Sequence, residues 1–62
     1  MKLTINGEPR DLDATVLSDV VPPGSVGVAV AVNGSVVPRG IRDSHALADG
    51  DVIDIVTATQ GG

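Results

Sequence analysis

The sequence predicts an α+β domain in which a mixed four- to five-stranded sheet packs on one short helix. Valine dominates a 62-residue chain that is 42% hydrophobic and has no aromatic residue, and β-branched side chains favour strands. Two Asn-Gly pairs, typical of tight hairpin turns, each follow a stretch of alternating apolar residues. Only one short segment, 16–21, places its apolar residues at helical spacing.

The first predicted element is a hairpin. Residues 1–5 are apolar at every second position and read as a strand. Asn6-Gly7 then supplies the turn, because both central positions of a type I′ turn need a positive φ. Residues 8–12 return as a second strand, and Pro9, which has no N–H to donate, places that strand at the edge of the sheet.

A short helix is expected next, with Asp13 or Thr15 as its N-cap. Its apolar face consists of Val16, Leu17, Val20 and Val21, and Pro22-Pro23-Gly24 ends it. The helix is barely two turns long, so packing against the sheet has to hold it in place.

Residues 27–32 read as the central strand, apolar on both faces. Val28, Val30 and Val32 share one face, and Ala29 and Ala31 share the other. One face must form the core with the helix, which leaves the other to dock a partner protein.

The rest of the chain adds one short and one long strand. Asn33-Gly34 is a second turn, Val36-Val37 continues briefly, and residues 39–48 are polar and irregular, with room for one helical turn. Asp49-Gly50-Asp51 is another tight turn, and residues 52–57 form the last strand. Residues 58–62 show no periodicity and read as a flexible tail.

The order of these elements is the layout of the β-grasp fold, with the first and last strands central and parallel. An open α+β meander is the alternative. Residues 1–57 are expected to form the β-grasp domain, followed by the tail at 58–62.

Composition excludes several classes of function. The absence of cysteine excludes a disulfide framework, a thiolate metal site and a cysteine nucleophile, and it fits a cytoplasmic protein. With a net charge of −4, four basic residues and no aromatic rings, the chain is not expected to bind nucleic acid. We expect no membrane span or secretory leader, because no long apolar run is present.

Three groups of polar residues are weighed as sites and set aside. Asp43, Ser44 and His45 are adjacent in an irregular loop, where a catalytic triad cannot form. Asp49, Asp51 and Asp54 lack the spacing of a calcium loop, so we expect them to cap a turn and predict no metal site. Arg39 and Arg42 are expected to be surface cations, with pairing to acidic groups of a partner protein as the alternative.

Four segments together resemble the ThiS family of sulfur carriers for thiamine biosynthesis, within the ubiquitin-like β-grasp superfamily that also includes the molybdopterin carriers. They are MKLTINGEPRDL, VAVAVNGSVVPR, LADGDVIDIVTATQGG and, within the last, the final Gly-Gly pair. The helical segment, TVLSDVVPPGSVG, is shorter than is usual for the family.

The resemblance implies a protein substrate rather than an enzyme. An E1-like activating enzyme (ThiF type) uses ATP to adenylate Gly62, a sulfur donor protein converts it to a thiocarboxylate, and a thiazole synthase (ThiG type) takes the sulfur. The carrier itself binds no cofactor. Thr59 and Gln60 then line the approach to the partner's active site, and Gly61 gives clearance where no side chain fits.

Other functions use the same tail. The chain could carry sulfur for molybdopterin or another sulfur metabolite, or it could be a ubiquitin-like modifier that is joined to lysines. A small hydrolase is a fourth and weaker alternative.

Overall fold

The computed structural model describes residues 1–22 and 27–57. Within these residues, five strands form one mixed sheet in the order β2-β1-β5-β3-β4. The strands are β1 (Lys2–Ile5), β2 (Glu8–Asp11), β3 (Val28–Val32), β4 (Ser35–Val36) and β5 (Val52–Thr57).

Strand β5 is the centre of this sheet. It pairs with β1 in parallel, with Thr4 opposite Val52, and antiparallel with β3 over residues 53–57. Strand β3, which the sequence predicts to be central, therefore lies one place from the centre. Strand β2 lies at one edge, as Pro9 predicts, and the β-grasp arrangement expected from the sequence is confirmed.

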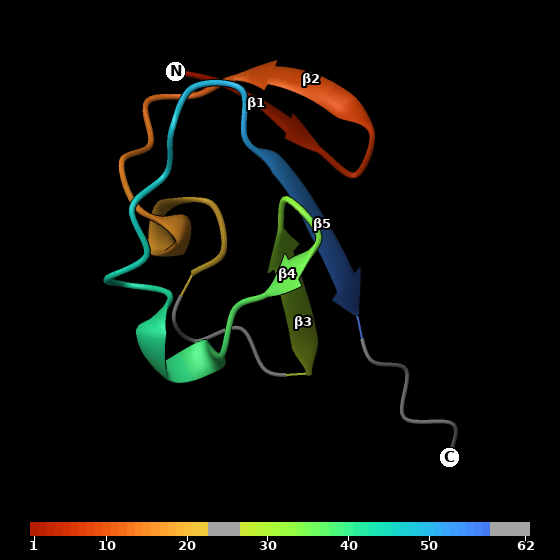
Figure 1. Ribbon diagram of the computed structural model, residues 1–62, viewed down its shortest axis with the longest axis vertical. Helices are drawn as coiled ribbons and strands as arrows, with labels where there is room; N and C mark the ends of the chain where they lie inside the picture. The colour runs from red at the N-terminus through yellow and green to blue at the C-terminus, as the bar shows by residue number, and fades with distance from the viewer. Residues whose placement is uncertain (23–26, 58–62) are drawn as a thin grey trace.

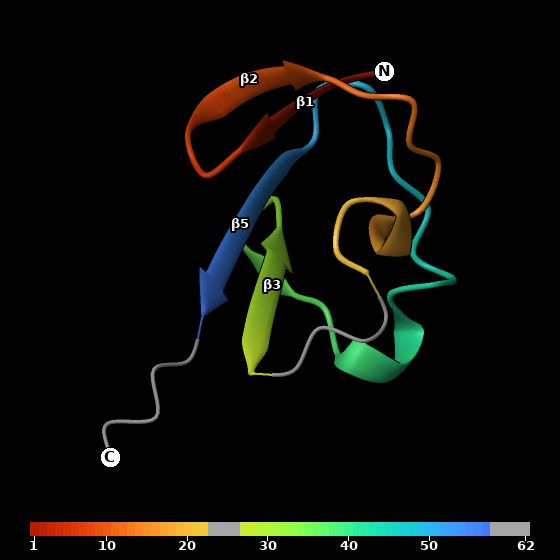
Figure 2. The same ribbon diagram turned by 180° about the vertical axis from the view of Figure 1, so that it is seen from behind.

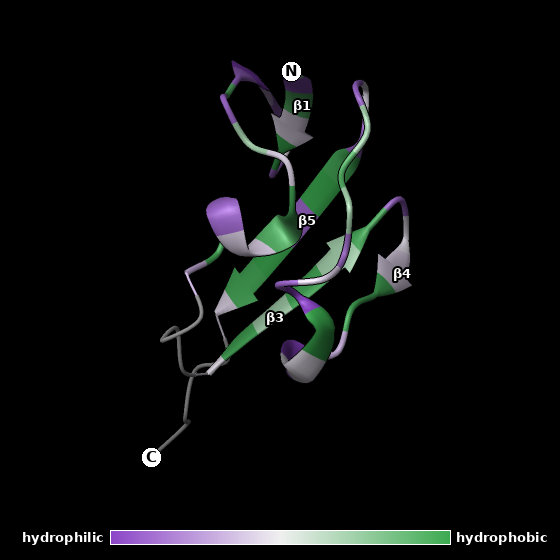
Figure 3. Ribbon diagram, turned by 90° about the vertical axis from the view of Figure 1, so that its left-hand side faces the viewer, coloured by the Kyte–Doolittle hydropathy of each residue, from purple (hydrophilic) through white to green (hydrophobic). Residues whose placement is uncertain are grey.

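One side of the sheet is covered by two irregular segments that contain the 3-10 turns η1 (Leu17–Asp19) and η2 (Arg39–Ile41). An isolated bridge between Val16 and Ala46 joins the two segments. Figures 1 and 2 place both turns on the same side of the strands, and Figure 3 looks onto that side, with β3 and β5 behind. The domain therefore has two layers, one of them mostly without regular structure.

The predicted helix is a single 3-10 turn in the structure, which is shorter than the expected two turns. Val16, rather than Asp13 or Thr15, takes the N-cap position and makes no side-chain cap. Asp19 instead reaches back, and its Oδ2 accepts hydrogen bonds from the Thr15 and Val16 amides at 2.9 and 3.1 Å. Because so few residues separate this carboxylate from Pro22, there is no length in which an α-helix could nucleate.

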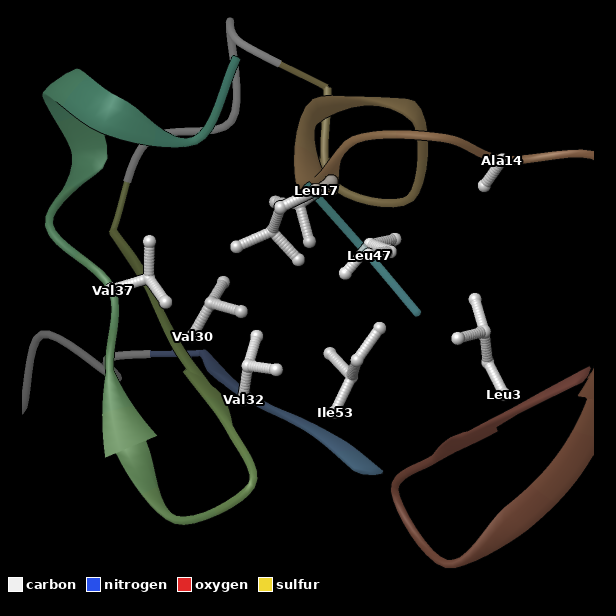
Figure 4. Packing of buried hydrophobic residues seen from close by; sticks show 9 residues of the cluster. Leu3, Ala14, Leu17, Val30, Val32, Val37, Leu47 and Ile53 are labelled. Atoms are coloured by element: carbon white, nitrogen blue, oxygen red, sulfur yellow. The ribbon is translucent and has the colours of Figure 1, made fainter. Parts of the chain in front are cut away.

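The core lies between the sheet and this covering layer. Leu17 and Ile53 are completely buried and Val30 is 1% exposed, and they face one another in Figure 4. The buried cluster consists of Leu3, Ala14, Leu17, Val21, Val30, Val32, Val37, Leu47 and Ile53. The valine face of β3 therefore points inward, where the sequence predicts that one of its two faces must pack.

Both Asn-Gly turns adopt the predicted left-handed geometry, with φ near 50° at Asn6 and Asn33. Their side chains also extend the pairing of β5. Asn6 Oδ1 accepts the Ile55 amide at 2.7 Å, and Asn33 Oδ1 accepts the Val52 amide at 2.9 Å. Each side chain supplies a hydrogen-bond acceptor to β5 at the point where its own backbone turns away. The two neighbours of β5, strands β1 and β3, are therefore bonded to it beyond their last paired residues.

Two substitutions at Asn33 separate the stability that its side-chain hydrogen bonds contribute from the effect of its left-handed backbone conformation. Asn33→Gly keeps the left-handed backbone but removes the side-chain hydrogen bonds to Val52 and Asp51, and we expect it to lower the free energy of unfolding by about 1–2 kcal/mol. Asn33→Ala adds a strained positive φ and should cost about 1 kcal/mol more. Urea denaturation measures both variants, and a glycine variant as stable as the parent would contradict a role for the side chain.

Candidate functional site

The predicted reacting segment, Thr59, Gln60, Gly61 and Gly62, lies outside the described residues, and so does the rest of the predicted tail. The structure does describe the strand that precedes it. Thr57, the last residue of β5, pairs with Val28, the first residue of β3. The base of the segment is therefore held by the antiparallel ladder at one end of the sheet.

The side of the sheet opposite the core carries small and branched apolar side chains. Register places Ala29 opposite Val56, and Ala31 opposite Val36, so these pairs share one face. Val36, Val56 and Val52 are 75%, 62% and 40% exposed. We call Ala29, Ala31, Val36, Val52 and Val56 the outer apolar face.

No described element covers the outer apolar face (Figures 1 and 2). Asp54 is exposed between Val52 and Val56 and puts one carboxylate into it. Beyond β5 the face becomes polar, where a cavity of about 360 Å³ is lined by residues of the hairpin that include Lys2 and Asp11. An apolar centre with a charged rim is typical of a protein-binding surface.

Sequence reasoning found only part of this face. It predicted that one of the two faces of β3 docks a partner, without deciding which, and the structure turns the alanine side outward. It did not join Val36, Val52 and Val56 to that side. The signal was present in the alternation of residues 52–57. What was missing was the register between β3 and its two neighbours, which a single sequence does not fix.

The loop around His45 is built as a turn and not as a triad. The Ser44 hydroxyl donates to the Ile41 carbonyl at 3.1 Å, and the His45 carbonyl accepts the Leu17 amide. Ser44 is therefore engaged with the backbone of its own turn.

Asp49 and Asp51 cap backbone groups, as predicted, but Asp54 does not, because it lies within β5, where its side chain makes no hydrogen bond to any described residue. Asp49 accepts the Lys2 amide, and Asp51 accepts the Ala48 amide at 2.8 Å and the Asn33 side-chain amide at 2.9 Å. Within residues 1–22 and 27–57, no three histidine or acidic side chains gather as a metal site would require. No helix in the same residues is long and apolar enough to cross a bilayer.

Arg42 corrects an expectation from the sequence. It was predicted to be a surface cation, but its side chain is only 4% exposed and its Nη2 donates to the Val28 carbonyl at 2.6 Å. Turn η2 explains the difference, because it directs the chain back toward the sheet immediately before this residue. Arg39, at the start of the same turn, is exposed as predicted.

A five-stranded β-grasp sheet with an uncovered apolar face, whose central strand is followed in sequence by Gly61 and Gly62, defines a small ubiquitin-like protein. Comparison with known proteins makes the assignment specific. The chain belongs to the ThiS family, whose family model matches residues 3–62.

Individual relatives agree with this assignment. The chain is 39% identical over 61 residues to the sulfur carrier protein ThiS of Thermus thermophilus, which covers 94% of this chain and 95% of that protein. The crystal structure of the thiamine biosynthesis protein ThiS from Geobacter metallireducens superposes with a TM-score of 0.76, at 32% identity and full coverage of both chains. A solution structure from the same organism gives a TM-score of 0.74 at 29% identity, covering all of this chain and 88% of the other.

Asp51 should make the stability of the domain fall in acid. The Ala48 amide, followed by the Asn33 side chain, holds the pKa of Asp51 below its ordinary value of 3.8. A carboxyl group with a lowered folded pKa contributes stability above its unfolded pKa and loses it as the pH falls through the folded value. We expect the free energy of unfolding to decrease below about pH 4.

Asp51→Asn should be less stable than the parent at neutral pH and show a shallower loss in acid, measured by urea denaturation at a series of pH values. Asp54→Asn is the matched control, because Asp54 makes no side-chain hydrogen bond within the described residues. An unchanged pH profile in Asp51→Asn would contradict the capping role.

Proposed function

We propose that this protein is a sulfur carrier of thiamine biosynthesis, and that it acts as a protein substrate rather than as an enzyme. The observation that carries the proposal is its 39% identity, over nearly the whole of both chains, to a curated sulfur carrier protein ThiS. The family match also runs through Gly62, the residue to which we assign the sulfur.

The proposed chemistry takes place on the carboxylate of Gly62. A carboxylate is a poor electrophile, so it is first activated: it attacks the α-phosphorus of ATP, pyrophosphate leaves, and an acyl adenylate forms. The terminal sulfur of a persulfide on a sulfur donor protein then attacks the acyl carbon and displaces AMP, and a thiol cleaves the resulting acyl disulfide to leave –COSH and a disulfide. In a thiazole synthase the thiocarboxylate gives its sulfur to the acceptor in exchange for an oxygen atom, so the carrier returns as the carboxylate.

The residues near Gly62 are suited to delivery into another protein's active site. Gly61 and Gly62 have no Cβ, so this end of the chain fits a passage too narrow for side chains. Thr59 and Gln60 would line the approach. Positioning and electrostatic stabilisation for adenylyl transfer would then come from a ThiF-type activating enzyme, which binds the ATP.

The outer apolar face is the surface we assign to docking on these partners. It shares strand β5 with the base of the tail, so a protein bound to Val56 would hold the tail at a fixed distance from its own active site. Proteins of the ThiF and ThiG types are the partners we propose for it. The cysteine-free composition fits the cytoplasm as the place where they meet.

Two other functions would use the same end of the chain. A carrier for molybdopterin or another sulfur metabolite would gain sulfur in the same way but deliver it to a different acceptor. A ubiquitin-like modifier would instead form conjugates of higher mass with lysines. The ThiS name of the relatives favours the thiamine pathway over both.

Gly62→Val should abolish sulfur loading while leaving the fold intact, because the branched side chain would not enter the passage. Intact-mass spectrometry after incubation with the activating enzyme, ATP and the sulfur donor measures the replacement of one oxygen by sulfur. Ala48→Val, which adds bulk at an exposed position, is the matched control. Normal loading of Gly62→Val would refute the narrow-passage argument, and lysine conjugates in place of the sulfur gain would support the modifier.

A charge on the outer apolar face should impair docking. We expect Val56→Asp to raise the KM of the activating enzyme for this protein by about tenfold, as loss of a central interface contact does. Ala46→Asp is the control, since Ala46 is also exposed but belongs to the segment of the covering layer that pairs with Val16. ATP–pyrophosphate exchange measures both variants, and an equal effect would contradict docking through the sheet.

A further inference from the structure

A second surface, separate from the outer apolar face, carries positive charge in an otherwise acidic protein. Two of the four basic residues, Arg39 and Arg42, line one cavity of about 350 Å³ together with Ser18, Gly40 and Asp43. Within the described residues, neither arginine makes an ion pair, whereas Arg10 pairs with Glu8. Asp43 offsets one of the two charges, so the lining is net positive.

The charge of Arg42 is only partly satisfied. Only 4% of Arg42 is exposed. Its Nη2 donates to the Val28 carbonyl, but Nε and Nη1 have no hydrogen-bond partner within residues 1–22 and 27–57. A guanidinium stays charged at any pH at which the protein is folded. A buried charge without a counter-ion is costly, so a nearby anion would be stabilised by it.

The position of the cavity indicates where such an anion would come from. Arg42 is bonded to Val28, which pairs with Thr57 at the end of β5, and Figures 1 and 2 both show η2 beside the beginning of β3. The cavity thus lies at the end of the sheet from which the chain continues to Gly62. A protein that receives the tail would bring its own surface to this place.

We propose that this cavity, which we call the arginine cavity, binds a carboxylate side chain on an acidic segment of a partner protein. Within residues 1–22 and 27–57, neither the exposed Arg39 guanidinium nor the Ser18 hydroxyl has a side-chain hydrogen bond, so both can donate to the carboxylate. The buried Arg42 supplies further positive charge. The choice of a protein as the source of the carboxylate rests on the proposed function. The outer apolar face would then provide area for binding, and the arginine cavity would fix orientation.

The three arginines give a direct test on the full chain. In protein with nitrogen-15 arginine, each Nε–H gives one signal, and Arg10 is an internal control because it already pairs with Glu8. The probe is a capped tri-glutamate peptide, compared at equal ionic strength with its tri-glutamine analogue. We expect saturable shifts at Arg39 and Arg42 with tri-glutamate alone, and no saturable shift at Arg10.

Two variants sharpen the test without touching the buried arginine. Arg39→Gln should weaken peptide binding by at least about fivefold. Asp43→Asn removes the opposing charge and should strengthen binding by about two- to fivefold. If Asp43→Asn leaves the affinity unchanged, or if all three arginines shift together, the arginine cavity is not a carboxylate site.

Inorganic phosphate is the second probe. Saturable binding of phosphate, with none of the peptide, would overturn the assignment of a partner's carboxylate. The titrations use neither ATP nor a sulfur donor, so their failure would overturn the arginine cavity alone. Failure of sulfur loading at Gly62 would overturn the sulfur-carrier function and leave the peptide result standing.

Discussion

Strand β5 depends on acceptors that two asparagine side chains supply at the points where its neighbours turn away. A hairpin turn ordinarily ends a ladder, because the backbone carbonyls of the turn no longer point at the next strand. Asn6 and Asn33 tolerate the left-handed backbone of these turns and carry an amide that replaces the missing carbonyl. The central strand is thus bonded beyond the last paired residues of its neighbours β1 and β3. This strand places Ile53 in the core and leads to the tail.

A chain of this size can cover only one face of its sheet, and that limit shapes the surface. A domain of about 60 residues buries roughly 60% of the surface that its unfolded chain exposes. Leu17, projecting from a single 3-10 turn, closes the core against Val30 and Ile53 without an aromatic side chain. The opposite face keeps small side chains such as Ala29 and Ala31, which a partner's surface can approach closely.

Local patterns predicted the fold well, and long-range geometry explains what they missed. Alternation and the Asn-Gly turns identify the strands within one or two residues, and Pro9 places β2 at the edge, because these are properties of neighbouring residues. The predicted helix was longer than the observed 3-10 turn, because helical spacing does not reveal that the Asp19 carboxylate accepts a hydrogen bond from the Thr15 amide. The burial of Arg42 depends on how η2 packs against β3, and this packing does not follow from sequence spacing. The position of Val36 on the outer apolar face depends on the register between β3 and β4, which sequence spacing does not fix either. The tail assignment came from the family resemblance and stays a prediction.

Net charge alone does not locate the partners of this protein, because three of its eight acidic side chains are placed by local structure, although they stay charged. Asp19, Asp49 and Asp51 accept backbone amides, so their charges are held in turns, where hydrogen bonds rather than a long-range field explain their presence. A net charge of −4 on its own would favour a basic partner surface. Beside the base of the tail, however, Arg42 donates to Val28, the residue paired with Thr57, and Arg39 lines the same cavity. Over the distance of a docking contact, local charges outweigh screened distant ones. A partner that reaches the tail therefore meets a locally positive surface on an acidic protein.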